Sequence, residues 1–159
     1  MTTLPRRVFL VAALAASVVR PARGQNAGLQ TFEKGSLSIR TRTATHRFNV
    51  EIARQPRQHA QGLMYRRHLA ADAGMLFLYS AARPASMWMK NTYIPLDMLY
   101  IDRNGRIVGF HERAVPGSLE VITSEEPVIA VLEVNGGTVA RLGITVGDQV
   151  IHPAFQAGG

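Results

Sequence analysis

Short runs in which apolar and polar residues alternate dominate this sequence, and they restrict the chain to a fold built from many brief strands. Phe48, Val50 and Ile52 alternate with polar residues, which is typical of a strand with one face in the core and the other in water. Leu37 and Ile39 show the same period of two a few residues earlier. The alternation therefore predicts strands around residues 37–39 and 48–52.

Three further runs favour strands of different kinds. Residues 75–79 are continuously apolar, as expected for a buried strand. Residues 128–134 are apolar on both faces except at Glu133, which predicts a central strand of the sheet. Asn104 and Gly105 lie in the middle of residues 98–108, and this pair predicts a hairpin whose tight turn has positive φ at both residues.

One helix is expected in this pattern. Residues 56–63 begin with Pro56, which suits a first helical turn, and Gly62 lies near the end. A last strand over residues 149–152 follows the turn residues Gly147 and Asp148. About eight strands with one short helix predict a small α+β domain, predominantly β. Its sheet is expected to be barrel-like or a folded antiparallel sheet.

The first 24 residues have the pattern of an export signal. Arg6 and Arg7 precede an apolar, alanine-rich run over residues 8–19, and Ala22-Arg23-Gly24 fits a cleavage site. Such a run is too short to cross about 30 Å of hydrocarbon as a helix. The paired arginines predict the twin-arginine route, with the general secretory route as the alternative. The protein is then expected to be soluble and periplasmic, or exported in another way.

The remaining chain divides simply. Residues 25–35 form a polar lead-in that we expect to be flexible, residues 36–153 the folded domain, and residues 154–159 a disordered tail. The sequence has no cysteine, which excludes disulfides and thiol chemistry. Stability is therefore expected to come from packing and backbone hydrogen bonds, and no transmembrane span is expected once the signal is removed.

The charge balance gives no reason to expect a nucleic-acid partner. The chain has 18 basic and 11 acidic residues, a net charge of +7. Four of the arginines and none of the acids lie in residues 1–24, so 14 basic and 11 acidic residues remain, a net charge of +3. That is an ordinary surface charge for a small domain, and no aromatic residues alternate with the basic ones as in single-strand binders.

Residues 87–97 are the most unusual segment. They contain the only tryptophan together with two methionines, a lysine, an asparagine and an aspartate, between plainly apolar stretches. Charges among large apolar groups are costly to bury unless they are paired. The segment therefore marks either a structural ion pair or a binding site.

Several short motifs follow one another along the chain. They are Gly62-Leu63-Met64-Tyr65-Arg66, Gly74-Met75-Leu76-Phe77, Trp88-Met89-Lys90-Asn91-Thr92, Ile94-Pro95-Leu96-Asp97, residues 131–137 (VLEVNGG) and Gly147-Asp148. In this order and spacing they resemble one known family, called domain of unknown function 192, over residues 48–151. The resemblance implies a compact β-rich domain, often exported in bacteria, and no established activity. Met87 departs from the family pattern, which usually has an aromatic residue there.

The leading hypothesis is a binding or accessory module without catalytic residues, cofactor or metal. Its polar-aromatic pocket would use Trp88 as an apolar wall, Lys90 as an anion contact and Asn91 as a hydrogen-bonding group. Asp97 and Glu133 would hold Lys90 in place, and a purely structural ion pair of these residues is the alternative. The partner would be a small molecule or an envelope component, and the sequence leaves its identity and the oligomeric state open.

Two other functions stay open at this point. Asp97 and Glu133 could be the acid–base pair of a hydrolase acting on envelope sugars, provided that their carboxyls face each other across a cleft. Met87 and Met89 could instead bind copper through their thioethers. That copper site would need a third sulfur from elsewhere in the chain and access from solvent.

Overall fold

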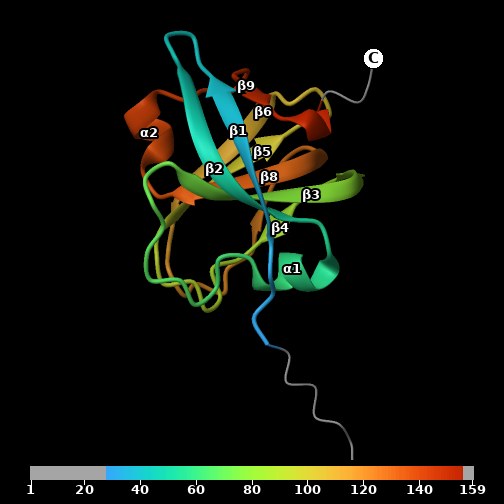
Figure 1. The fold of residues 1–159 in the computed structure, drawn as a ribbon, viewed down its shortest axis with the longest axis vertical. Helices are drawn as coiled ribbons and strands as arrows, with labels where there is room; N and C mark the ends of the chain where they lie inside the picture. The colour runs from blue at the N-terminus through green and yellow to red at the C-terminus, as the bar shows by residue number, and fades with distance from the viewer. Residues whose placement is uncertain (1–27, 156–159) are drawn as a thin grey trace, which may run out of the picture.

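The structure, a computed structural model, describes residues 28–155. The predicted export signal and the residues 156–159 of the predicted tail lie outside this range. Residues 28–155 form nine strands and two short helices (Figure 1). The strands are β1 Glu33–Arg40, β2 Thr45–Ala53, β3 Ala73–Arg83, β4 Ser86–Met87, β5 Leu96–Ile101, β6 Ile107–Ala114, β7 Ile122–Thr123, β8 Val128–Asn135 and β9 Gln149–Ile151. The helices are α1 Pro56–Gln61 and α2 Thr138–Leu142, and a 3₁₀ turn covers Pro153–Phe155.

Seven of the strands form one curled sheet in the order β6-β5-β8-β3-β2-β1-β9, while β4 and β7 pair separately. Neighbours in the large sheet are antiparallel except β2 and β3, which run parallel with α1 in their connection. The two edges of the sheet meet at one bridge between Arg106 and Gln149, so the sheet curls into a half-barrel. The prediction of a small, predominantly β domain is confirmed, with one parallel pair in a sheet expected to be antiparallel.

Strand β8 is central, as its apolar run predicts. It lies between β5 and β3 and contributes to the core on both of its faces. Ala130, Leu132 and Val134 pack in one buried cluster with β1 and β2 residues, whereas Val131 packs in a second cluster on the opposite face. Alternation along a strand places Glu133 on the same face as Val131. Glu133 is therefore an ionisable side chain on a strand that is buried on both faces, which makes it a candidate functional residue.

The β5–β6 hairpin is formed, but its turn differs from the prediction. Gly105 has a φ of 76°, whereas Asn104 is not among the residues with positive φ. The Asp102 N–H donates to Arg106 O across a three-residue loop, in which glycine takes the left-handed position. The Asp102 carboxylate also accepts hydrogen bonds from the backbone N–H groups of Asn104 and Arg106, at 2.8 Å each. This side chain stabilises a wider turn than the Asn-Gly pair alone favours.

Both ends of the folded region extend beyond the predicted limits. Strand β1 begins at Glu33, inside the segment 25–35 expected to be a flexible lead-in, and Phe32 packs against the second cluster. At the other end, Phe155 is buried, with its ring edge against His152 at a centroid distance of 5.9 Å. Packing of Phe32 and Phe155 thus orders the ends of the domain, although the polar composition of these segments predicts flexible ends.

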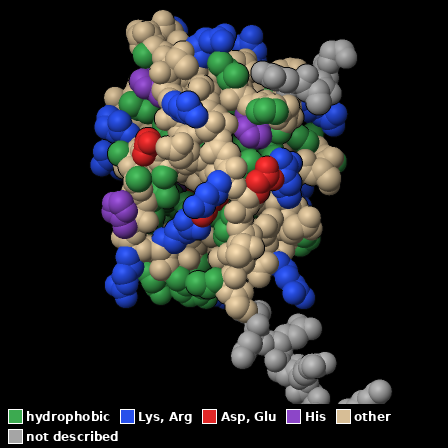
Figure 2. Space-filling view, viewed as in Figure 1, with side chains coloured by type: hydrophobic (Ala, Val, Ile, Leu, Met, Phe, Trp, Pro, Cys, Tyr) green, Lys and Arg blue, Asp and Glu red, His purple; other side chains and the backbone are tan. Residues whose placement is uncertain are grey.

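The surface shows no large basic area on the face seen in Figure 2, where lysine and arginine side chains are scattered among other groups. This distribution agrees with the modest charge of the chain after residue 24. Among residues 28–155, no helix has the length and apolar character needed to cross a membrane.

Candidate functional site

Glu133 is the buried charge-bearing group around which the candidate site forms. Its register partners are Met75 on β3 and Met98 on β5, and both methionines are fully buried in the second cluster. Directly paired residues share a face of the sheet, so the Glu133 side chain lies between two thioethers. Only 4 % of Glu133 is exposed, and its carboxyl has no ion pair or hydrogen bond within residues 28–155.

Burial decides the ionisation state of this carboxyl. Desolvation raises the pKa of Glu133 from 4.5 to about 8, because the surrounding apolar groups disfavour the charged form. Two tyrosines nearby are affected in the same way: burial raises the pKa of Tyr79, and it raises that of Tyr100 to about 12. At neutral pH, Glu133 is therefore mainly a neutral carboxylic acid, which can both donate and accept a hydrogen bond.

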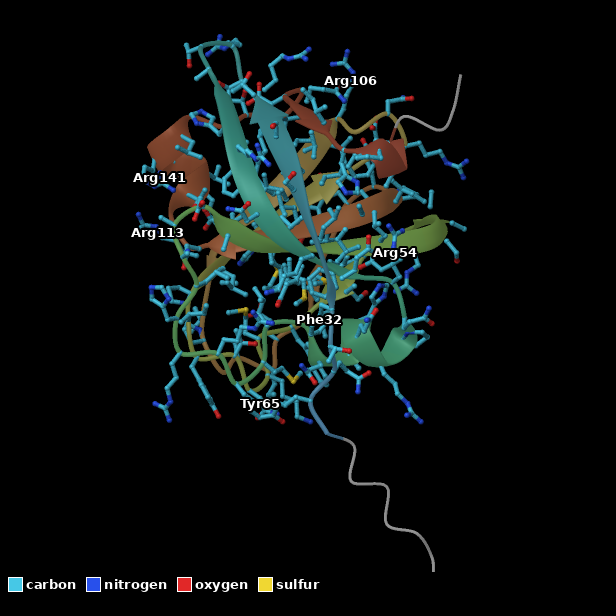
Figure 3. All side chains as sticks on the ribbon, viewed as in Figure 1. Phe32, Arg54, Tyr65, Arg106, Arg113 and Arg141 are labelled. Carbon is cyan, nitrogen blue, oxygen red and sulfur yellow. The ribbon has the colours of Figure 1, made fainter. Side chains whose placement is uncertain are left out.

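A small pocket opens above this carboxyl. Its volume is about 60 Å³, enough for the end of a ligand rather than for a whole cofactor. Side chains from α1, the loop after it, β3, β4 and β8 converge there, and Figure 3 shows the sulfur atoms gathered in the half of the molecule that contains α1. The lining residues are His59, Ala60, Gln61, Gly62, Leu63, Met64, Phe77, Ser86, Met87, Trp88, Thr92 and Glu133.

Trp88 and Lys90 follow β4 and lie at the surface, while Met89 between them is fully buried. The Lys90 ammonium nitrogen lies 5.1 Å from the centre of the Trp88 ring, a cation–π contact. Trp88 is 44 % exposed and lines the pocket. Lys90 does not line it, and within residues 28–155 it forms no ion pair. The expected contacts of Lys90 with Asp97 and Glu133 are therefore absent.

Replacing Lys90 is expected to have little effect on stability. Lys90→Met removes only an exposed cation–π contact, which is worth about 0.5–1 kcal/mol. Urea unfolding measures the change in the free energy of unfolding for Lys90→Met. Lys34→Met, at an exposed position on β1, is the control measured in parallel. A loss of several kcal/mol specific to Lys90→Met would show that its ammonium is paired in a buried site.

Asn91 has a structural reason to occupy its position. Its φ of 55° is left-handed, a conformation that asparagine tolerates better than most residues. Its side-chain amide donates to the Tyr65 hydroxyl at 3.1 Å and approaches the Met64 sulfur at 4.0 Å. Asn91 O also accepts a hydrogen bond from the Tyr65 N–H. Asn91 therefore holds the Met64 side of the pocket without lining the pocket itself.

Asp97 lies outside the pocket, and its carboxylate has a different set of partners. It is fully buried on β5, where Oδ1 accepts hydrogen bonds from the N–H groups of Arg113 at 2.8 Å and Gly137 at 2.9 Å. Oδ2 accepts from the Val139 N–H at 2.8 Å. Gly137, at φ 87°, is the residue before α2, so Asp97 caps this helix from a distant strand. Both oxygens are thus occupied by backbone donors.

The methionines converge only in part. Met87 and Met64 line the pocket, and the Tyr79 hydroxyl lies 3.7 Å from the Met87 sulfur. Met89 and Met75 have no exposed surface and lie in the second cluster. The sequence pair Met87 and Met89 therefore does not present two accessible sulfurs to one site. Residues 28–155 also contain no cluster of three histidine or acidic side chains suited to a metal ion.

His59 is the pocket residue that the sequence gives least reason to select. It lies on α1, and its ring meets Tyr79 and Phe77 edge to face at centroid distances of 5.3 and 5.8 Å. Its Nε2 lies 2.9 Å from Ala53 O, and a carbonyl can only accept, so Nε2 carries the hydrogen. In the neutral ring Nδ1 is then an acceptor. No local motif around His59 indicates this environment, which arises from packing of α1 against β3.

Fold and site together define a small half-barrel domain with a neutral buried carboxyl beneath an aromatic rim. The chain belongs to the DUF192 family, described as Uncharacterized ACR, which matches residues 37–152. The identification from the sequence motifs is confirmed by this match. No curated protein matches the chain.

Two solved structures are similar over most of the chain. One, a protein of Sinorhizobium meliloti 1021 described as a candidate transcription regulator, is 49 % identical with a TM-score of 0.77. The similarity covers 80 % of this chain and 99 % of that one. The other, a protein of unknown function from Novosphingobium aromaticivorans DSM 12444, is 36 % identical with a TM-score of 0.74 and coverage of 87 % and 94 %. The half-barrel is thus shared with both.

Proposed function

We propose that this chain is a binding module whose ligand inserts an uncharged polar group into the Glu133 pocket. The observation that carries the proposal is the Glu133 carboxyl, which is buried without an ion pair or hydrogen bond in the described residues and borders an opening. Its oxygens are not among the fully buried, unpartnered side-chain atoms of the described residues, so a group at the opening can reach them. A bound carbonyl or hydroxyl group would supply the missing hydrogen bond.

The surroundings of Glu133 indicate the kind of ligand. Its neutral carboxyl can donate to a carbonyl or accept from a hydroxyl, and Trp88 offers a partly exposed ring on which a sugar or a planar amide could pack. Ser86 and Thr92 add hydroxyl groups to the lining. The small volume limits the inserted part to a few atoms, so the remainder of the ligand would lie along the rim. A small envelope component exported alongside the protein fits this description.

The proposed ligand binding agrees better with the geometry than the two alternatives. A sugar hydrolase with Asp97 and Glu133 as its acid–base pair would need both carboxyls at one cleft, but the Asp97 oxygens are held by backbone N–H groups. Copper binding by Met87 and Met89 would require an accessible Met89 sulfur, and Met89 is fully buried.

The proposal is tested by ligand-induced stabilisation of residues 25–159. The panel contains neutral sugars, peptidoglycan fragments, small amides, organic acids and Cu(I). A ligand at one hundred times its Kd raises the free energy of unfolding by about 2.7 kcal/mol, which is readily seen as a higher melting temperature. We expect a neutral sugar or amide to give this shift and organic acids to give none.

Two variants locate the binding. Trp88→Ala is expected to abolish the shift, whereas Tyr93→Ala removes a similarly exposed aromatic ring outside the pocket and should leave it unchanged. Glu133→Gln should retain partial binding, because an amide also donates and accepts hydrogen bonds. Stabilisation by an organic acid alone, or equal loss in Trp88→Ala and Tyr93→Ala, would refute the proposed site.

A further inference from the structure

A second hollow lies on the opposite edge of the sheet from β9, beside β6. It has a volume of about 400 Å³ and shares no lining residue with the Glu133 pocket. Val108, Phe110 and Ile122 form an apolar part of its floor, beside the polar side chains of Thr123 and Ser124. Two exposed glutamates, Glu125 and Glu126, also line it. A neighbouring hollow of about 350 Å³ continues along the same edge and shares His111, Ile122 and Thr123 with the first. We name the two together the β6 groove.

Strand β6 leaves one row of backbone groups without a partner strand. It is the last strand of the large sheet, and only Ile107 at its beginning is hydrogen-bonded on the outer side, to the backbone of Gly147 and Asp148. Within residues 28–155, no backbone group outside β5 bonds to the stretch 108–112. Unpaired edges of this kind are sites where an extended chain adds as a further strand.

The surface around this edge is unusually apolar. Val115 and Val121 line the groove and are 67 % and 61 % exposed, and Val146 at its other end is 60 % exposed. Leu119, in the same β6–β7 connection, is 67 % exposed. A group of exposed large apolar residues beside an open sheet edge marks an interaction surface more strongly than scattered ones would.

The charges of the groove select among possible partners. Glu125 and Glu126 line its first part and Glu120 its second, while no lysine or arginine among the described residues lines either part. The rim is therefore acidic, and lysine or arginine side chains would complement it. The open stretch 108–112 spans about 16 Å at ~3.3 Å per residue, which suits pairing with about five residues of a partner segment.

We propose that the β6 groove binds an extended, basic segment of a partner protein, which pairs with β6 as an added strand. Main-chain hydrogen bonds to β6 supply affinity, and alternate side chains contact either the apolar floor or the glutamates.

The test uses isotope-labelled residues 25–159 and a seven-residue peptide of alternating valine and lysine. We expect the peptide to shift the amide resonances of residues 108–112 and to slow their hydrogen exchange. A peptide with glutamate in place of lysine, and one with alternate backbone amides methylated, should bind at least about tenfold more weakly. Equal binding of the methylated peptide, or no change at residues 108–112, would overturn strand addition.

Charge reversal supplies the matched variants. Glu125→Lys with Glu126→Lys should weaken peptide binding at least about tenfold, whereas Glu33→Lys changes an equally exposed glutamate on β1 and should not. All three side chains are at the surface, so the variants are expected to fold, and circular dichroism checks this. Binding that survives the double reversal would overturn the basic partner. If the peptide does not bind, and the chain instead forms a concentration-dependent dimer in which the β6 amides exchange slowly, the proposed peptide partner would be wrong. The occupant of the groove would then be a second copy of this chain.

Discussion

Glu133→Gln is expected to make the domain more stable than the natural protein at pH 9, with a difference that shrinks to about 1 kcal/mol or less at pH 5. The folded protein holds the pKa of Glu133 at about 8 through burial, against 4.5 for the freely solvated group. Between these values the folded state binds more protons than the unfolded state, so stability falls as the pH rises through this window. Above pH 8 the natural domain carries the full cost of ionising a buried carboxyl.

The size of the effect follows from the difference between the two pKa values. Each unit corresponds to 1.36 kcal/mol, so the cost at pH 9 is at most roughly 5 kcal/mol. Glutamine cannot ionise and keeps nearly the same shape, so its stability should lack this fall. Tyr79 and Tyr100 do not add charge in the window, because burial raises both of their pKa values above the usual 10.

Urea unfolding of both proteins at pH 5, 7 and 9 measures this difference, and groups that titrate in both proteins cancel. Glu112→Gln is the matched control, since it makes the same substitution at an exposed position on β6. Parallel stability curves for Glu133→Gln and the natural protein would mean that Glu133 ionises freely in the folded state. The neutral hydrogen-bonding group that the proposed pocket requires would then not exist at pH 7.

The sequence predicts those parts of the fold whose cause is local. Alternation along 48–52 and the apolar run of 128–134 indicate strands β2 and β8, because the side chains that face the core lie within each strand itself. Pro56 marks the start of α1 for the same reason. The five residues of α2 give no such signal, since the side chain that satisfies the beginning of this helix comes from Asp97, forty residues away from Gly137.

The candidate site shows the same division. Trp88 and Glu133 were selected as unusual residues in apolar surroundings, and the structure brings both to one pocket. The sequence predicts Lys90 between two carboxylates, whereas in the structure its ammonium group lies over the neighbouring Trp88 ring. Nothing in the sequence distinguishes these two partners. His59 reaches the pocket only through the packing of α1 against β3, which is a tertiary effect. Composition thus finds unusual residues, whereas their partners depend on the folded chain.

Asp97→Ala is expected to be the most destabilising single change in residues 28–155 among those considered. It removes the acceptor of three backbone N–H groups, on Arg113, Gly137 and Val139, and the fully buried position limits their replacement by water. Each unsatisfied buried donor costs about 1–3 kcal/mol, so a loss of roughly 3–5 kcal/mol is expected. The melting temperature should fall by roughly 10 °C or more.

A graded series separates capping from simple loss of a side chain. Asp97→Asn can keep the Oδ1 acceptor for Arg113 and Gly137, but it sets an amide NH₂ against the Val139 N–H, so an intermediate loss of about 1–3 kcal/mol is expected. Asp102→Ala removes an aspartate that also accepts two backbone N–H groups, but in an exposed turn where water replaces it, and should cost less than either. Urea unfolding of the three variants measures the order. A cost for Asp97→Ala no larger than that for Asp102→Ala would mean that α2 does not depend on this carboxylate, and Asp97 would again be free to serve a ligand.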